Sequence, residues 1–295
     1  MTRRFNRWLI FFAVLLLLPY WWFMLDNRQG DAAAKPLHIW ELRALATSLS
    51  GGPPQAVEAE NLANRTVTKG LYVTGAGLKR QALAIIAYRL ALPDSGPILI
   101  DTGPKTDNSQ KLHYHHFDAA SEQRLVAAMG QASLILLTHR HIDPIGGLKT
   151  ALSQANHQNL PSHVGAGASK MAAASPYAIA PGVVAIPAPS HAPDTQMYYV
   201  WLGDGREYLF TGDIAPYAAN FQDIRGKARI LDQLDDTKNR REVFSWLITI
   251  HQLQIESPKL IIVPSHDYEW LRMAYHHGII REHFTPEPPH VDKTG

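Results

Sequence analysis

The chain has 295 residues, of which 18% are charged, and its formal net charge is +2. Because the basic and acidic residues nearly balance, a broad polyanion-binding surface is excluded, and we predict no nucleic-acid partner. Cysteine is absent, which excludes disulfides, thiolate metal ligands and a cysteine nucleophile. Any metal must therefore be held by the histidines, of which there are 15, and by carboxylates, which suits zinc, iron or manganese.

The first 25 residues resemble a membrane signal anchor. A basic segment, residues 1–7, precedes an uninterrupted apolar run from Trp8 to Leu25. As a helix this run spans ~27 Å, close to the ~30 Å hydrocarbon core of a bilayer. The basic flank predicts a cytoplasmic N-terminus, with the rest of the chain on the periplasmic or otherwise extracytoplasmic side.

A cleaved signal peptide is the alternative for this segment. Ala32-Ala33-Ala34 resembles a cleavage site, but it lies well beyond the apolar run. Arg3-Arg4 also suggests twin-arginine export, although the residues that follow fit that signal poorly.

The remaining sequence predicts a linker with one short helix, then a mixed α/β domain. Residues 26–54 form the linker, with a helix from Ile39 to Ser48, and residues 55–290 form the domain. The predicted helices of the domain cover about 118–129, with Asp118 or Ser121 as cap, and 239–253. The predicted strands are 66–74, 83–92, 97–101, 133–137, 183–186, 196–202, 207–211 and 260–263.

Residues that can bind metal follow several of these strands directly. Side chains from distant parts of a sequence converge where strands of a rigid sheet end, so these residues are candidates for one site. His139 and His141 are alternate residues, which point the same way in extended backbone. The set comprises Asp101, His139, His141, Asp143, His191, Asp213 and His266.

These residues resemble the motifs of the metallo-β-lactamase superfamily. That family carries T-H-x-H-x-D-H-x-G-G, a later His before a Pro-containing turn, an Asp in T-G-D, and a final His after an apolar strand. The corresponding residues here are Thr138 to Gly147, Ser190-His191-Ala192-Pro193, Thr211-Gly212-Asp213 and Ser265-His266. Ile100-Asp101-Thr102-Gly103 also matches a strand end usual in the family.

The resemblance implies a four-layer αββα sandwich with metal at one edge, between two sheets. His139, His141 and His191 would form the first metal position, with Asp213 bridging to a second position that uses Asp143 and His266. Pro144 stands where the family has a histidine, so the second position loses an imidazole. We therefore expect one tightly bound Zn²⁺, with Fe or Mn as alternatives, and a second ion that is weak or absent.

Other polar residues have supporting or open roles. In related proteins the residue at Asp101 orders the metal loop through hydrogen bonds. Tyr217 follows Asp213 closely, and either donates to a substrate carbonyl or packs in the core. The cluster His113-Tyr114-His115-His116 is either a polar surface loop or a replacement for the nitrogen lost at Pro144.

The sequence thus predicts a metal-dependent hydrolase acting on a small molecule. Metal-activated water would attack an ester-like or amide-like bond, with Asp143 accepting or positioning the proton, and a lactone or other carboxylic ester is preferred. Two alternatives remain open: a catalytically silent binding protein, and an iron-dependent redox enzyme or dioxygenase on the same fold.

Overall fold

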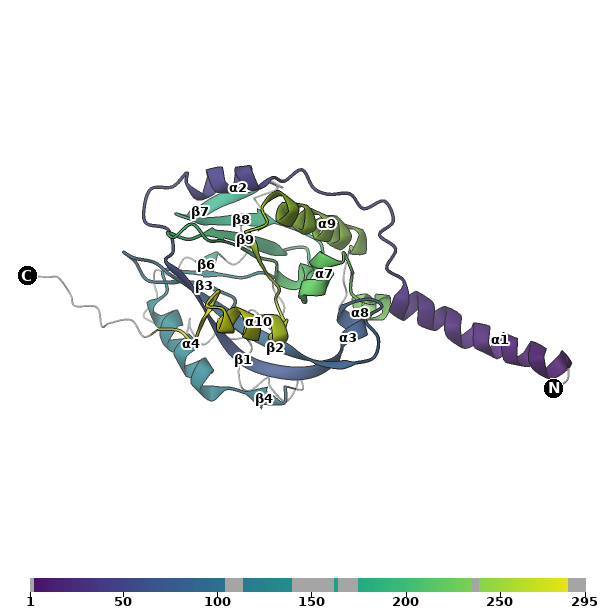
Figure 1. Cartoon of the computed structure of the whole chain (residues 1–295). Coiled ribbons are helices and arrows are strands. Elements are labelled where there is room, and N and C mark those ends of the chain that lie inside the picture. Colours follow the sequence, from purple (N-terminus) through teal and green to yellow (C-terminus); the bar gives the residue numbers. More distant parts are fainter. Residues whose placement is uncertain (1–2, 104–113, 140–161, 164–174, 235–238, 286–295) are drawn as a thin grey trace, which may run out of the picture.

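The computed structural model describes residues 3–103, 114–139, 162–163, 175–234 and 239–285 (Figure 1). Several predicted residues lie outside these ranges: His113, His141, Asp143 and Pro144.

The first β-sheet has seven strands within the described ranges and is mixed in direction. Its long antiparallel pair, β1 with β2, continues into three parallel neighbours, β3, β5 and β6. Six strands follow the order β12 (Arg281–Glu282), β1 (Ala56–Thr68), β2 (Arg80–Ala91), β3 (Ile98–Ile100), β5 (Leu134–Leu136) and β6 (Ser162–His163). The seventh, β4 (His116–Phe117), pairs with β1.

The second sheet has five strands in the described part of the chain and packs against the first. Its order is β11 (Ile261–Val263), β10 (Glu207–Phe210), β9 (Gln196–Trp201), β8 (Val183–Pro187) and β7 (Tyr177–Ala180). Alternate residues of its strands face opposite ways: Val183 and Ala185 belong to the core between the sheets, whereas Val184 and Ile186 belong to the core beneath the outer helices. A strand buried on both faces explains the wholly apolar runs of the sequence.

Helices cover the outer faces of both sheets, which gives four layers (Figure 1). Helices α2 (Ile39–Ala46) and α9 (Arg240–Glu256) pack on the second sheet, and α4 (Ala119–Gln131) packs on the first. Asp118 caps α4 by accepting from the backbone N–H groups of Ala120 and Ser121. The predicted αββα sandwich is therefore confirmed. The shorter helices are α3 (Lys69–Tyr72), α7 (Ala218–Gln222), α8 (Arg229–Leu234) and α10 (Tyr268–His276).

One predicted strand was wrong in its position. The sequence predicts a strand over 66–74, but β1 covers Ala56–Thr68 and the chain then turns into α3. The first half of β1 carries Glu58 and Glu60, whose side chains are buried. Two acidic residues interrupt the apolar pattern, so the pattern does not identify this strand as buried. A buried charge is favourable only when residues from other parts of the chain pair with it.

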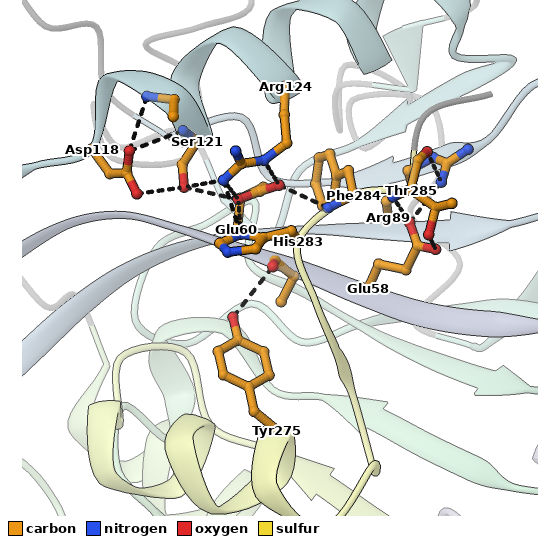
Figure 2. A network of polar contacts seen from close by, with 12 residues as sticks. Glu58, Glu60, Arg89, Asp118, Ser121, Arg124, Tyr275, His283, Phe284 and Thr285 are labelled. Carbon is orange, nitrogen blue, oxygen red and sulfur yellow. Dashed lines mark hydrogen bonds and ion pairs between the residues drawn. The ribbon is translucent and has the colours of Figure 1, made fainter.

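Those partners form the polar network of Figure 2. Glu58 accepts from Arg89 Nη1 at 2.6 Å and from Thr285 Oγ1 at 2.7 Å. Glu60 accepts from Arg124 Nε at 2.6 Å and from the Phe284 backbone N–H at 2.7 Å. Burial raises the pKa of Glu60, but the Arg124 guanidinium and these hydrogen bonds outweigh burial and hold the pKa below its usual range. The network ties residues 283–285 to β1.

The apolar N-terminal segment forms a helix that projects from the domain (Figure 1). Helix α1 covers Arg3–Tyr20 and continues as a single π-helical turn, η1, over Trp21–Leu25. The segment Arg3–Leu25 has a mean hydropathy of 2.1 in its most apolar window, none of which is buried. By length and composition this helix is able to cross a membrane. A signal sequence meets the same criteria.

Candidate metal centre

Three of the predicted ligands converge where strands of the two sheets end. His139 follows β5, His191 follows the turn after β8, and Asp213 lies in a short 3-10 helix after β10. Their ligand atoms all lie within 4.8 Å of one another, and both histidines are buried. The Nε2 atoms of His139 and His191 lie 3.8 and 3.6 Å from Asp213 Oδ2.

These separations suit a shared cation better than direct hydrogen bonds. Two ligands about 2.0–2.1 Å from one tetrahedral zinc are separated by roughly 3.3 Å, whereas N–H···O bonds are about 2.9 Å long. Two imidazoles and a carboxylate are also ligands that zinc accepts in proteins. The donor set of His139, His191 and Asp213 therefore fits a divalent metal ion.

The orientation of His139 is set by Asp101, through Thr138. Asp101 Oδ1 accepts from the Thr138 backbone N–H at 2.8 Å, and Oδ2 accepts from Thr138 Oγ1 at 2.9 Å. Thr138 Oγ1 lies 3.1 Å from His139 Nδ1. When the hydroxyl donates to Asp101, it accepts from Nδ1–H, which leaves the Nε2 lone pair directed at the ligand group.

The carboxyl group of Asp101 has a pKa raised to about 7. Burial is the main cause, and the negative charge of Asp213 adds to it, while the Thr138 hydrogen bonds act in the opposite direction. Asp101 also has a positive φ of 59°, a conformation that Asp tolerates better than most residues. Asp101 thus contacts the residue that precedes His139, and its supporting role stays a prediction.

His266 contacts the other oxygen of Asp213. Its Nε2 lies 2.9 Å from Asp213 Oδ1, and its Nδ1 lies 2.8 Å from the carbonyl oxygen of Ala84. A carbonyl only accepts, so Nδ1 carries a proton and Nε2 faces Asp213. Ser265 Oγ donates to the same Oδ1 at 3.0 Å.

A buried lysine completes the group, and the sequence motifs did not reveal it. Lys227 is 5% exposed, and its Nζ lies 3.6 Å from Asp213 Oδ2. Burial raises the pKa of Asp213, but the positive charges of His266 and Lys227 act against burial, and the pKa lies well below its usual range. The only sequence signal was a lysine in an otherwise mixed segment, FQDIRGKARI, which has no periodic pattern.

Gly212 allows the loop of Asp213 to approach the loop of His139. A Cβ atom at Gly212 would lie 2.9 Å from Thr138 Cβ, and the φ of this residue is +51°. Both the close approach and the left-handed backbone favour glycine. Steric fit therefore explains why glycine stands between Thr211 and Asp213.

The remaining predicted residues lie elsewhere or outside the described ranges. Tyr217 is buried, and its hydroxyl donates to the Ala82 carbonyl oxygen at 3.1 Å, which fits the packing alternative. His115 and His116 are exposed at β4 beside β1, as a surface segment would be. His141 and Asp143 fall outside the described residues, so their roles stay predictions.

Two sheets flanked by helices, with histidines and an aspartate at one edge, define the metallo-β-lactamase fold. Solved structures that share it are N-acyl homoserine lactonases and metal-dependent hydrolases of that superfamily. A quorum-quenching N-acyl homoserine lactone lactonase matches with a TM-score of 0.57 and 17% identity, over 76% of this chain and 97% of its own. A probable metal-dependent hydrolase from Staphylococcus aureus matches with a TM-score of 0.52 and 11% identity, over 74% of this chain and 91% of its own.

A dizinc quorum-quenching lactonase with bound product has a TM-score of 0.51 and 10% identity, over 76% of this chain and 92% of its own. No family model and no curated protein matches the sequence. At these identities the likeness shows the fold.

Proposed function

We propose that this chain is a metal-dependent hydrolase that cleaves a lactone or another carboxylic ester and is anchored in a membrane by its N-terminal helix. The observation that carries the proposal is the buried group of His139, His191 and Asp213, whose ligand atoms lie within 4.8 Å of one another. Hydrolysis needs a cation with an open position for water, and three protein ligands leave one.

The lactone preference draws on the structural neighbours. One solved neighbour is an N-acyl homoserine lactone hydrolase with its product N-hexanoyl-L-homoserine bound at the catalytic metal centre, and another is a dizinc lactonase. Both share the fold of this chain, with TM-scores of 0.57 and 0.51. Their chemistry motivates the choice of a cyclic ester as the first substrate to test.

Each residue of the site has a proposed part. His139, His141 and His191 would form the first metal position, and Asp213 would bridge to any second ion, to which His266 and Asp143 would contribute. When bound, a zinc ion lowers the pKa of water toward ~7 and polarises a carbonyl oxygen. Asp143 would accept the proton of the attacking water, while Asp101 fixes His139 through Thr138.

Lys227 supports the expectation of one tight ion. Its ammonium lies 3.6 Å from Asp213 Oδ2, while Oδ1 of the same carboxylate contacts Ser265 and His266. The ammonium already compensates part of the negative charge of Asp213, which leaves less charge to attract a second cation. Together with Pro144 in place of the family histidine, this favours a mononuclear centre.

The anchor also has structural support, because the residues that follow the apolar run are held by the domain. The side chain of Asp26 is fully buried and accepts from Arg229 Nε at 2.8 Å. Signal peptidases cleave just after the apolar segment in an accessible, extended stretch. We therefore favour retention of the helix over its removal, with the domain on the extracytoplasmic side.

The decisive experiment is elemental analysis of the purified protein followed by a substrate panel of lactones, thioesters, β-lactams and phosphoesters. About one zinc per chain with turnover of a lactone or ester is expected. Bound iron with redox activity would favour the dioxygenase alternative. A metal-free protein that hydrolyses nothing in the panel would refute the proposal in favour of a silent binding protein.

A further inference from the structure

The end of the N-terminal helix is fixed to the domain by several polar contacts. The Asp26 carboxylate pairs with Arg229, whose Nη2 lies 2.6 Å from Asp26 Oδ2. The backbone carbonyl of Asp26 accepts from Arg240 Nη2 at 3.2 Å. The guanidinium of Arg229 also stacks over the Trp22 ring, 4.3 Å from its centroid. These contacts hold the end of the helix, at Trp22 and Asp26, against the domain.

The next residue connects the helix to the segment that carries Lys227. Asn27 Nδ2 donates to the Ile224 carbonyl at 3.0 Å, and Asn27 Oδ1 accepts from the Gly226 N–H at 3.0 Å. Gly226 directly precedes Lys227, whose Nζ contacts Asp213. The candidate metal centre consequently lies at the same end of the domain as the helix exit.

Exposed apolar side chains surround this exit. We call Leu25, Leu78, Ile230 and Leu234 the collar; they are 37%, 66%, 38% and 76% exposed. Ile230 and Leu234 are four residues apart on α8, so they share one side of that helix, which packs against η1 (Figure 1). Leu78 lies in the segment between α3 and β2. Helix α3 itself also contacts η1 and α8.

Basic residues stand beside the collar. Lys79 and Arg80 follow Leu78 and are exposed, and the Arg28 side chain is 61% exposed. Apolar side chains flanked by cations suit the interface of a bilayer that contains anionic lipid. There the apolar side chains of a protein enter the headgroup region, and its cations contact the lipid phosphates.

We propose that the collar, with Lys79 and Arg80, is a membrane-docking surface that lies on the bilayer crossed by α1. The occupant is an anionic phospholipid surface, because the helix that leaves this face brings the bilayer to it and the exposed Lys79 and Arg80 are positive. Docking holds the candidate metal centre at the membrane-facing end of the domain. The inference rests on the anchor of the proposed function and is independent of hydrolysis.

Single-cysteine labelling tests the docking, since the chain has no cysteine of its own. Full-length Leu78→Cys and Leu234→Cys, each carrying an environment-sensitive fluorophore, are reconstituted in phosphatidylcholine–phosphatidylglycerol vesicles with nitroxide-labelled lipid. The matched control is Ile255→Cys, which is 65% exposed but lies at the far end of α9, roughly 22 Å along the helix from Arg240. Thermal melts verify that all three labelled proteins are folded.

We expect the lipid nitroxide to lower the fluorescence at positions 78 and 234 about twofold or more, and to leave position 255 unchanged. Lys79→Glu combined with Arg80→Glu should weaken the effect at position 234. Equal fluorescence changes at all three positions would overturn the proposal. Flotation of the same samples separates the two ideas: protein that does not float with vesicles refutes the anchor, whereas floating protein without quenching refutes docking alone.

Discussion

The ammonium of Lys227 lies 3.6 Å from Asp213 Oδ2, the oxygen that also faces His139 and His191. A metal ion held by these residues would share this oxygen with a fixed positive charge. Lys227 and the ion therefore both compensate the charge of Asp213, one permanently and the other only when bound.

Replacement of Lys227 by Met tests this relationship. Loss of the ammonium leaves the buried carboxylate with less compensation, so the metal-free protein should lose about 1–3 kcal/mol of unfolding free energy. The rise in melting temperature on adding zinc should then exceed that of the wild type, because the ion restores the missing charge. Thermal melts with and without chelator measure both effects.

Lys227→Arg is the control, since it keeps the positive charge. It should resemble the wild type in the size of its zinc-induced shift. A Met variant as stable without metal as the wild type would show that Lys227 contributes nothing to the charge balance of Asp213.

Loss of a proposed ligand should remove the metal and spare the fold. His139→Ala and His191→Ala should each lower zinc affinity by at least about tenfold, the effect seen even for residues behind the ligands. Elemental analysis after gel filtration measures retention, and circular dichroism checks the fold. His276→Ala, an exposed histidine at the end of α10, is the control. Full metal content in both ligand variants would contradict the assignment.

Pro144 should keep the metal content near one ion per chain. Proline offers no side-chain ligand, so we expect about one tight zinc, and mild chelation should remove any second ion. Pro144→His supplies the family imidazole and should increase retention of a second ion in competition with a chelator. Two equally tight ions in the wild type would point instead to His113, His115 or His116 as substitute ligands.

The raised pKa of Asp101 predicts a pH dependence of stability. With a folded pKa of about 7 and an ordinary unfolded value, the folded protein binds more protons between about pH 4 and 7. The stability contributed by the protonated carboxyl is thus full at low pH and is lost as the pH rises through 7.

Asp101→Asn should remove this dependence; the Asn oxygen can still accept from the Thr138 backbone N–H, while its NH2 group would donate to Thr138 Oγ1 and no longer accept from it. Between pH 5 and 8 the metal-free wild type should lose on the order of 1–2 kcal/mol more unfolding free energy than the variant. Urea denaturation at both pH values gives the two differences. Parallel losses in the two proteins would show that Asp101 titrates in its ordinary range.

The buried pair Glu58–Arg89 should be essential for the C-terminal attachment of Figure 2. Glu58→Gln leaves Arg89 without its charged partner, and should lower the unfolding free energy by about 3 kcal/mol. Glu282→Gln changes a neighbouring exposed residue and should change it by less than about 0.5 kcal/mol. Equal melting temperatures for the two variants would refute the role of the network.

Much of the architecture followed from local patterns. The apolar runs predicted β5, β8, β9 and β10 close to their observed bounds, because strands buried on both faces carry few polar residues. The predicted helices began close to the observed starts of α4 and α9, where the side chains of Asp118, one of two predicted caps, and Asn239 accept from the first N–H groups. The ordered motifs likewise placed His139, His191 and Asp213 at strand ends, where they now lie together.

Other features depended on contacts between distant residues. Glu60 is buried in β1 because Arg124, 64 residues away, reaches it from α4. Lys227 joins the candidate metal centre because Asn27 and Thr74 hold the neighbouring Gly226, and Asp26 is buried because Arg229 and Arg240 lie at the helix exit. The sequence by itself determined the wholly apolar strands, the starts of the two long helices of the domain and the order of the motif residues. Only the tertiary structure decided which charges became buried, because a buried charge is stable only beside partners that folding brings to it.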